Sequence, residues 1–338
     1  MILTKHILKH VPPSRSVRLP PSNHKDLEKK LYAHEIEKEI PGFNSFLFKN
    51  CLIINGLIVS LPFFRFHTAL SSYLNYSLLK KIKLLKCLKK PGPILKEGIW
   101  ITDNWSNNYF HWICDALPRL IMSNNQLNIK TVILPEHYIK HSYVSETLDL
   151  MGFSIQTITS SSSNLVRKLI CTEHLAPSGN YYKKSLIELR DKLRLDGNKE
   201  CFKRIYISRE KASHRKIINE SSIIPILKKH DFSVVYFEEL DWLNQRQLLS
   251  ETEVLMSIHG AGLTNMLLLP NNGKVIEIRN KDNAHDNCFF SLASELSIEY
   301  YLLPAEPIKS VILNTDYDQI DVMVDPANLD HFLTKYLR

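Results

Sequence analysis

Glycine is scarce in this sequence, with 10 in 338 residues, yet two of the ten fall within one short stretch, SIHGAGLTNMLLLP, at 257–270. The stretch lacks the third glycine of a G-x-G-x-x-G fingerprint and the GK[ST] ending of a Walker loop, which argues against both of those phosphate sites. A glycine tolerates close approach of other groups to the backbone. Gly260 and Gly262 therefore predict that something lies very near the main chain here.

Paired cysteines and long apolar runs are also missing. No CxxC pair occurs, which argues against a zinc site and against a small disulfide framework. The first residues, MILTKHILKHVPPS, have no continuous apolar core and fail as a secretory signal. The best apolar run, 51–64, is too short for a membrane span, and its Asn55-Gly56 pair predicts a β-hairpin. We therefore expect a cytoplasmic protein. We also expect its six cysteines to be free thiols: Cys51, Cys87, Cys114, Cys171, Cys201 and Cys288.

The overall composition is that of a soluble globular protein, with 44% hydrophobic and 23% charged residues. A formal charge of +8 suits nucleic acid, an anionic membrane surface or a polyanionic ligand such as a sugar nucleotide. The stretch 76–90, YSLLKKIKLLKCLKK, predicts a basic amphipathic helix. Such a helix either packs on its own domain with its lysines solvated or makes peripheral contact with an anionic membrane.

Strands and helices alternate along most of the chain, which predicts an α/β protein with parallel sheets. Two facing Rossmann-like domains with a cleft between them fit this alternation and the chain length. The predicted organisation is an N-terminal acceptor domain at 1–175, a linker at 176–200, a nucleotide-sugar-binding domain at 201–305 and a C-terminal helical segment at 306–338. A short helix is expected around 26–36.

The glycine-bearing stretch lies where a predicted buried strand ends and a helix begins, the place where open α/β sheets bind ligands. Helix dipole and exposed N–H groups there suit an anion. A tight turn whose glycines only ease packing remains an alternative. The candidate donor-binding residues are His259, Gly260, Ala261, Gly262, Leu263, Thr264 and Asn265.

A basic loop, REKASHRK at 209–216, follows another predicted strand. Guanidinium groups bind phosphate in a bidentate manner, so Arg209 is the candidate diphosphate anchor and Arg215 a second contact. A solvated charge run is the alternative. In the N-terminal half, NNYFHWICDALPRL places His111 and Asp115 four residues apart on one helical face, as a candidate acid–base pair or as a buried, hydrogen-bonded pair.

These three stretches, NYFHWICDALPRL, YISREKASHRKIINE and SIHGAGLTNMLLLP followed by KVIEI, resemble in order and separation the glycosyltransferase family 61, of the bacterial type linked to capsular and surface polysaccharide. The resemblance implies a GT-B fold, a nucleotide-sugar donor that is UDP-linked, inversion at the anomeric carbon and no metal or other cofactor. It also implies a glycan or lipid-linked glycan acceptor, with Asp115 and His111 facing it. Glu277 would then lie near the ribose.

Two other readings stay open at this point. A pyruvyl or phosphoryl transferase acting on polysaccharide would also use Arg and His at a sheet edge. A non-catalytic basic binding protein would account for the charge, although the basic residues follow no RRM, OB or helix-turn-helix pattern, so nucleic acid is not an expected partner. The DxD sequence Asp316-Tyr317-Asp318 follows the last predicted βα unit and is expected in a solvated turn, without a metal.

Overall fold

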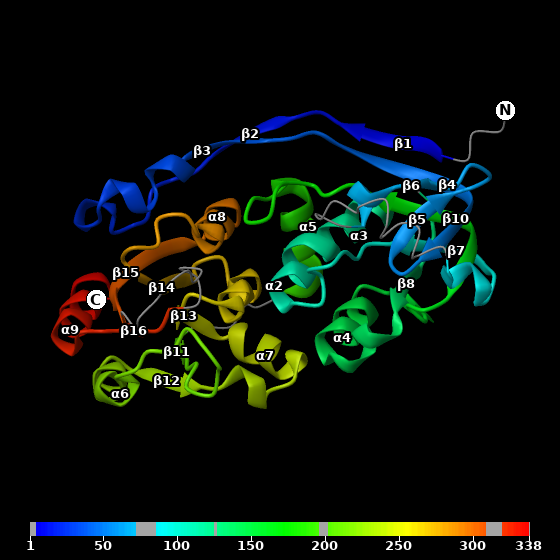
Figure 1. Ribbon diagram of the computed structural model, residues 1–338. Helices are drawn as coiled ribbons and strands as arrows, with labels where there is room; N and C mark the ends of the chain where they lie inside the picture. The colour runs from blue at the N-terminus through cyan, green and yellow to red at the C-terminus, as the bar shows by residue number, and fades with distance from the viewer. Residues whose placement is uncertain (1–4, 72–85, 125–126, 196–201, 309–319, 338) are drawn as a thin grey trace. The chain divides into compact units, whose positions relative to one another are not determined.

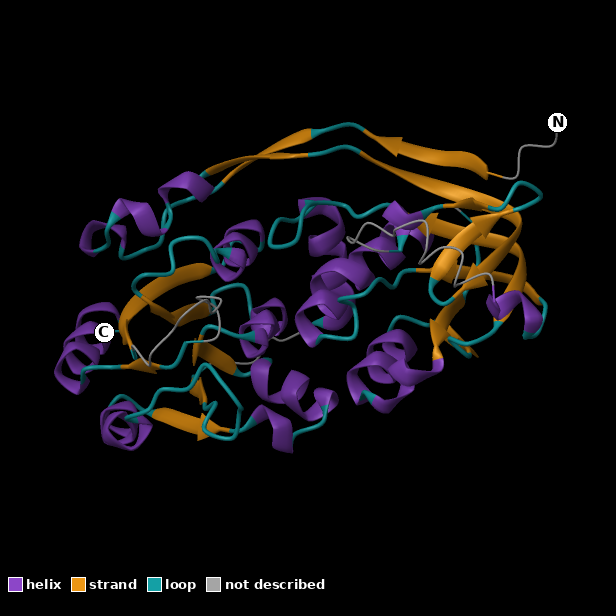
Figure 2. Ribbon diagram, in the orientation of Figure 1, coloured by secondary structure: helices purple, strands orange, loops and turns teal. Residues whose placement is uncertain are grey.

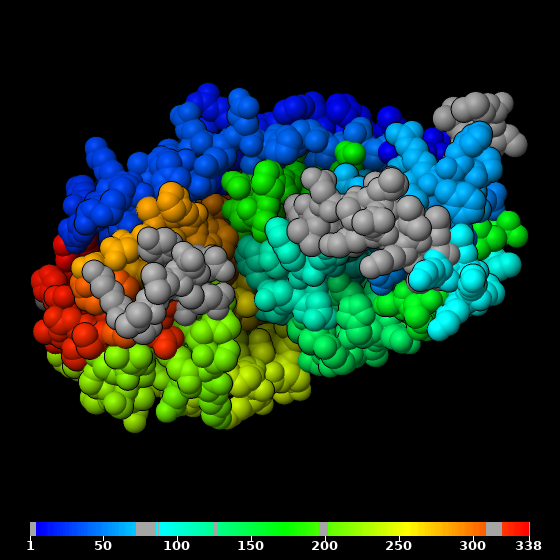
Figure 3. Space-filling view, viewed as in Figure 1, coloured from blue at the N-terminus to red at the C-terminus, as the bar shows by residue number. Residues whose placement is uncertain are grey.

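The computed structural model describes residues 5–71, 86–124, 127–195, 202–308 and 320–337, and the remaining residues are grey in Figure 1, Figure 2 and Figure 3. The chain divides into two compact units. Unit 1 comprises residues 1–14 and 39–193, and unit 2 comprises residues 15–38 and 194–338. These bounds differ from the predicted domains, because residues 15–38 fold with the later part of the chain and residues 176–193 with the earlier part.

Unit 1 is built on an eight-stranded mixed sheet in the order β6-β5-β4-β10-β7-β8-β9, with β1 paired to β4. The strands β10, β7, β8 and β9 run parallel, whereas β1, β5 and β10 pair with β4 in the antiparallel sense. The predicted Rossmann-like parallel sheet is therefore correct for only half of this unit. The strands are β1 Lys5–Val11, β4 Phe43–Ile54, β5 Leu57–Ser60, β6 Arg65–Phe66, β7 Leu95–Trp100, β8 Thr131–Pro135, β9 Ser154–Ile158 and β10 Ser163–Thr172.

The antiparallel half arises from the hairpin that the sequence predicted. Asn55 and Gly56 have φ angles of 45° and 78°, which is the left-handed pair that a two-residue turn between β4 and β5 requires. The residues before this hairpin were expected to be irregular. They form strands instead, because Phe43, Phe46 and Phe48 alternate with more exposed residues and bury against the sheet.

Helices cover the parallel part of unit 1: α2 Tyr109–His111, the π-helical turn η6 Trp112–Ala116, α3 Leu117–Asn124, η7 Glu136–Lys140, α4 Ser142–Leu150 and α5 Lys183–Leu193. Short 3₁₀ turns lie at η4 Thr68–Leu70 and η5 Lys86–Lys89. The expected linker at 176–200 is wrong over α5, whose Leu186 and Leu189 are buried in unit 1. Most of the predicted basic helix at 76–90 lies outside the described residues.

Unit 2 has a six-stranded sheet in the order β12-β11-β13-β14-β15-β16, drawn in orange in Figure 2. The first five strands are parallel, and β16 is antiparallel to β15. The strand order reverses between β11 and β13, which is the switch point where doubly wound sheets bind ligands. The strands are β11 Lys203–Ile207, β12 Phe232–Val235, β13 Thr252–Ile258, β14 Lys274–Asn280, β15 Glu299–Pro307 and β16 Val322–Met323.

The helices of unit 2 follow the predicted alternation: α6 Glu220–Lys229, η8 Phe237–Glu239, α7 Trp242–Leu249, η9 Ala261–Leu268, α8 Cys288–Glu295 and α9 Pro326–Tyr336. Asp241 caps α7 as expected, accepting the N–H of Asn244. The segment expected to be separate after 305 is part of the unit, because Leu329 and Leu333 of α9 belong to its main apolar core.

Residues 15–38 also belong to unit 2. The helix expected at 26–36 is replaced by three short 3₁₀ turns, η1 His24–Asp26, η2 Lys29–Leu31 and η3 Ala33–Glu35, flanked by the paired strands β2 Ser14–Val17 and β3 Glu37–Ile40. Arg18 is buried and donates to both the backbone and the side chain of Glu35. This buried ion pair folds the segment back on itself, so tertiary contacts prevail over weak helix periodicity.

Candidate active site

Arg209 lies at the switch point of the unit 2 sheet, one residue beyond Ser208 at the end of β11. Its guanidinium donates to the backbone oxygens of His214 and Arg215, both at 3.3 Å, so the basic loop holds it in place. Burial, followed by the charge of Arg215, lowers the pKa of Arg209. A partly desolvated guanidinium at a strand end is suited to bind an anion.

Gly260 is explained by Arg209. A Cβ added at Gly260 would lie 2.9 Å from Nη1 of Arg209. The backbone of Gly260 is extended, so the glycine is required for close packing and not for an unusual φ angle. Gly262 lines the same pocket as Arg209 and Lys211. The first glycine of the pair, Gly260, therefore makes room for the side chain of Arg209.

The amides available to an anion differ from those that the sequence indicated. The N–H of Leu263 donates to the oxygen of Gly260 at 2.9 Å, which is the first bond of the 3₁₀ helix η9. A 3₁₀ helix then uses the amides of the following residues, Thr264 and Asn265, and leaves those of its first two residues without an internal acceptor. Ala261 and Gly262 hold these positions.

Among the predicted side chains of this loop, Thr264 keeps a donor to offer. Its Oγ1 is buried and has no hydrogen-bond partner among the described residues. Asn265 is buried and donates to Gln245 of α7 at 3.3 Å, and Leu263 is fully buried. Arg215 has a left-handed backbone with φ 56° and a buried Nε that lacks a partner among the described residues.

His259 is held between two carboxylates. Its Nδ1 pairs with Glu277 of β14, and its Nε2 lies 2.7 Å from Asp286. Burial alone would lower the pKa of His259, but the two carboxylates outweigh it and raise the pKa to about 9. Both ring nitrogens of the resulting imidazolium donate to carboxylates, so the expected donation from His259 to phosphate has no nitrogen left for it.

Glu277 was expected near a ribose. It is fully buried and accepts hydrogen bonds from His259 and from the hydroxyl of Tyr300. Asp286, which the sequence did not single out, lies in the loop after β14 and has its pKa lowered to about 2, since His259 outweighs the opposing effect of burial. The three ionised groups fix the base of the glycine loop to the two segments beside it.

One set of potential metal ligands occurs among the described residues: His259, Asp286 and Cys288 offer ligand atoms within 4.8 Å of one another. A metal ligand must be a neutral imidazole, whereas the flanking carboxylates raise the pKa of His259 to about 9. A cation at this position would therefore have to displace the proton from His259. The DxD sequence at 316–318 lies outside the described residues.

In unit 1, the predicted pair of His111 and Asp115 does meet: Nδ1 of His111 lies 2.7 Å from Oδ2 of Asp115. The intervening turn is π-helical rather than α-helical, a local widening that recurs at functional sites. Burial raises the pKa of the Asp115 carboxyl above its ordinary value, against the opposing effect of His111. A carboxylate with a raised pKa is better matched to proton abstraction near neutral pH.

A second histidine–carboxylate pair, which the sequence reasoning missed, lies beside the first. Asp103 follows β7 and His174 follows β10, and the carboxyl ends of these adjacent parallel strands bring Nε2 of His174 within 2.8 Å of Oδ2 of Asp103. Arg119 fixes both strand ends by donating to the oxygens of Ile101 and Thr172. The rule that side chains gather after parallel strands, applied to Arg209, would have found this pair too.

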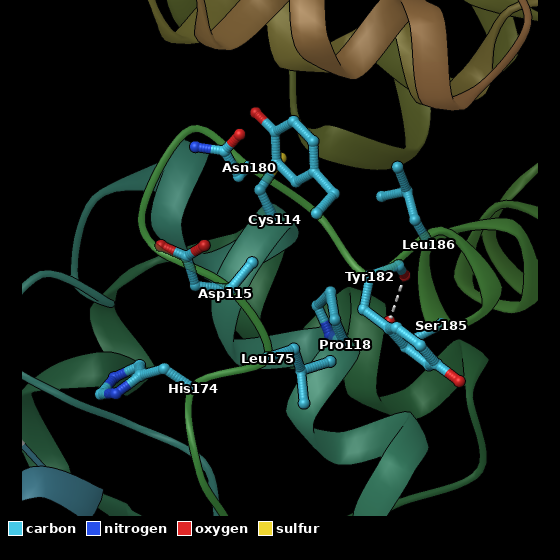
Figure 4. A pocket seen from close by; sticks show the side chains of 11 residues that line it. Cys114, Asp115, Pro118, His174, Leu175, Asn180, Tyr182, Ser185 and Leu186 are labelled. Atoms are coloured by element: carbon cyan, nitrogen blue, oxygen red, sulfur yellow. Dashed lines mark hydrogen bonds between the residues drawn. The ribbon is translucent and has the colours of Figure 1, made fainter. Parts of the chain in front are cut away.

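Asp115 and His174 line one small pocket of unit 1, together with Cys114, Pro118 and Asn180 (Figure 4). The view places both on the left side of the residues drawn, Asp115 on the helical turn and His174 on the segment after β10. Burial lowers the pKa of His174, so its ring is held toward the neutral form. The pocket therefore combines a carboxylate and an imidazole, the side chains that most often transfer protons in enzymes.

Comparison with known proteins finds that this chain is similar to glycosyltransferases. Residues 109–276 match the family model of Glycosyltransferase 61, a range that contains Asp115, His174, Arg209 and the glycine loop. The protein from Drosophila melanogaster named EGF domain-specific O-linked N-acetylglucosamine transferase is 34% identical over 98 residues, which cover 28% of this chain and 18% of that protein. The rat protein of the same name is 31% identical over 119 residues, covering 34% and 22%.

The chain thus spans about a fifth of the length of these curated relatives. Both relatives are animal proteins. These matches therefore do not support the bacterial, capsular type of enzyme that the resemblance implied. No helix among the described residues is long and apolar enough to cross a membrane. The family match favours an enzyme over a non-catalytic basic binder, and the chain carries a glycosyltransferase family 61 domain.

Proposed function

We propose that this chain is an inverting glycosyltransferase that takes a sugar from a UDP-linked donor and transfers it to an acceptor hydroxyl without a metal ion. The observation that carries the proposal is the placement of Arg209 against Gly260 at the switch point of the unit 2 sheet. The guanidinium, the amides of Ala261 and Gly262 and the hydroxyl of Thr264 are the donors suited to a diphosphate.

The proposed reaction is a single displacement at the anomeric carbon. The acceptor oxygen forms a bond to that carbon while the bond from the carbon to the diphosphate oxygen breaks, and its electron pair leaves with the diphosphate. Asp115 takes the acceptor proton, and His111 holds the carboxylate in place. Arg209 stabilises the negative charge that grows on the leaving diphosphate. His259 supports the loop through its two carboxylates rather than touching the phosphate itself.

The acceptor has two candidate classes. The family resemblance implied a glycan or lipid-linked glycan of a surface polysaccharide, made at the cytoplasmic face of a membrane. The relatives are named for transfer of N-acetylglucosamine to EGF domains, which points to a hydroxyl on a protein. Free thiols at Cys51, Cys114, Cys171 and Cys288 suit a reducing compartment and so support the first class.

The test is the binding of UDP to the purified chain, measured by titration calorimetry in the presence of a chelator. We expect saturable binding to the natural protein, with UDP-linked sugars competing for the same site. The Arg209→Ala variant should bind at least tenfold more weakly, whereas Arg167→Ala, which removes an exposed arginine of unit 1, should bind as the natural protein does. Binding that disappears with the chelator would refute the metal-free part of the proposal.

A further inference from the structure

A second and larger pocket of unit 1 has no role in the proposed transfer of the proton. It lies at the carboxyl ends of β7 and β8 and is lined by Trp100, Thr102, Asp103 and Tyr138, and by the turn of the β4–β5 hairpin. Asp103 connects it to the small pocket, because Asp103 lines the larger pocket while its carboxylate binds His174 in the smaller one. The larger pocket is therefore next to the candidate base.

Three buried polar groups on the lining of this pocket lack a hydrogen-bond partner among the described residues: Nε1 of Trp100, Oγ of Ser71 and Oγ1 of Thr102. Trp100 and Thr102 are each 1% exposed, and Ser71 is 3% exposed. A buried donor without a partner is unfavourable, so such groups are uncommon and call for water or a ligand. Three such groups on one pocket indicate a ligand independently of the pocket's shape.

The charge of the lining restricts what can bind. No lysine or arginine lies among the described lining residues, and burial lowers the pKa of His137, which favours its neutral form. A phosphate or carboxylate group would find no lysine or arginine among these described residues. The lining instead combines the aromatic rings of Trp100 and Tyr138 with the polar side chains of Asn104 and Asn107.

We infer that this pocket is a binding subsite for a neutral sugar residue, and that the acceptor of this enzyme is consequently a glycan; the role as acceptor subsite rests on the proposed function. A pyranose ring presents an apolar C–H face to aromatic rings and a rim of hydroxyls to amides and orphaned donors. The hydroxyls of one sugar residue can accept from Trp100 and Ser71 together, which satisfies both groups in the bound state.

The test uses the full chain and methyl glycosides of glucose, galactose, mannose and N-acetylglucosamine, with methyl glucuronide as the charged comparison. Saturation-transfer difference NMR, with and without UDP, should detect at least one neutral glycoside, and the glucuronide should bind more weakly. Ser71→Ala should reduce the affinity about two- to tenfold, the effect of one hydrogen bond. Trp100→Phe should reduce it similarly, since it keeps an aromatic ring and removes the N–H.

The matched control is Ser291→Ala on α8 in unit 2, which removes another buried hydroxyl that lacks a partner among the described residues and belongs to the lining of neither unit 1 pocket. It should leave glycoside binding unchanged. The Ser71 hydroxyl makes no hydrogen bond to a described residue, so the Tm of Ser71→Ala should stay near that of the natural protein.

Binding of none of the neutral glycosides, or equal binding by the natural protein and both pocket variants, would overturn the inference. UDP binding separates its failure from that of the proposed function. If UDP binds and the glycosides do not, the sugar subsite is wrong and the donor site stands. If glycosides bind in a Trp100-dependent and Ser71-dependent way but UDP does not, the subsite stands as a sugar site and the proposed donor site falls.

Discussion

The pockets of the two units differ in the charge of their linings. The unit 2 pocket contains Arg209 and Lys211, whereas the larger unit 1 pocket has no lysine or arginine among its described lining residues. Both lie at the carboxyl ends of parallel strands, so the same sheet geometry presents a cationic surface in one unit and a surface of aromatic rings, amides and the Asp103 carboxylate in the other. A diphosphate and an uncharged acceptor are the ligands that these two linings separately suit.

The way the charges are fixed also differs. Arg209 is held by backbone oxygens of its own loop and keeps its charge for a ligand, while the imidazolium of His259 is neutralised by Glu277 and Asp286 inside the protein. In unit 1, by contrast, the imidazole of His111 has one carboxylate partner among the described residues, Asp115. A histidine with one partner retains a second ring nitrogen for a substrate, whereas a histidine with two partners serves the structure.

Substituting Asp115 should have the largest effect on turnover and should leave the unit 2 pocket intact. Asp115→Asn keeps the shape of the side chain but removes its basicity, and we expect kcat to fall by about 10² to 10⁴. UDP affinity, measured by calorimetry, should not change. A kcat equal to that of the natural protein would exclude Asp115 as the base. A loss of UDP affinity would contradict the assignment of donor binding to unit 2 alone.

Substituting Arg209 should weaken UDP binding, which substituting Asp115 should leave unchanged. We expect Arg209→Ala to lower kcat/KM by about 10² and to weaken UDP binding, because the charge that develops on the leaving group loses its partner. Arg209→Lys keeps the charge and loses the planar fork, so it should recover part of the affinity only. If Arg209→Ala binds UDP as tightly as the natural protein does, the donor lies elsewhere.

The buried imidazolium predicts a pH dependence of folding. His259 has a pKa of about 9 in the folded protein against an ordinary value of 6.5, so its contribution to stability is complete below pH 6.5 and is lost as the pH rises toward 9. At about 1.36 kcal/mol per pKa unit, the free energy of unfolding should fall by about 3 kcal/mol over that range.

Chemical denaturation between pH 6 and 9.5 measures this decrease. His259→Gln should be destabilised at pH 6.5, because both carboxylates lose a charged partner, and its stability should vary less over the same alkaline range. If the free energy of unfolding depended on pH in the same way for the natural protein and for His259→Gln, His259 would not be charged in the folded state.

Substituting Gly260 should have the smallest effect. The Cβ of Gly260→Ala would meet the flexible end of Arg209, which can move, so we expect little change in Tm and a loss of UDP affinity of about tenfold. The control is Ala261→Gly, which alters the same loop without adding an atom. Gly152→Ala would be unsuitable, because Gly152 has a left-handed backbone with φ 73°, which an alanine rarely adopts. UDP affinity of Gly260→Ala equal to that of the natural protein would show that the close packing serves only the fold.

Local sequence patterns predicted what depends on neighbouring residues. The alternation of apolar runs gave the five parallel strands of unit 2, Asn55-Gly56 gave the hairpin, and the spacing of His111 and Asp115 gave their contact. These features are encoded within one or two turns of the chain, where backbone geometry fixes which side chains meet.

Long-range pairing was beyond such patterns. The sequence did not reveal that residues 15–38 fold with unit 2, that β4 pairs with β10 in the antiparallel sense, or that Asp103 meets His174 across 71 residues. It also assigned His259 to phosphate, because nothing near position 259 indicates that Glu277 and Asp286 come to both sides of the ring.

The alternating α/β composition, the basic loop after one strand and the glycine pair after another follow from the order of the residues alone. Which hydrogen-bond donors remain available for a ligand depends on the folded chain, because a donor that already binds a protein group is no longer free. The folded chain brings carboxylates to His259, leaves Arg209 packed on Gly260, and leaves the buried donors of Trp100 and Ser71 without partners among the described residues.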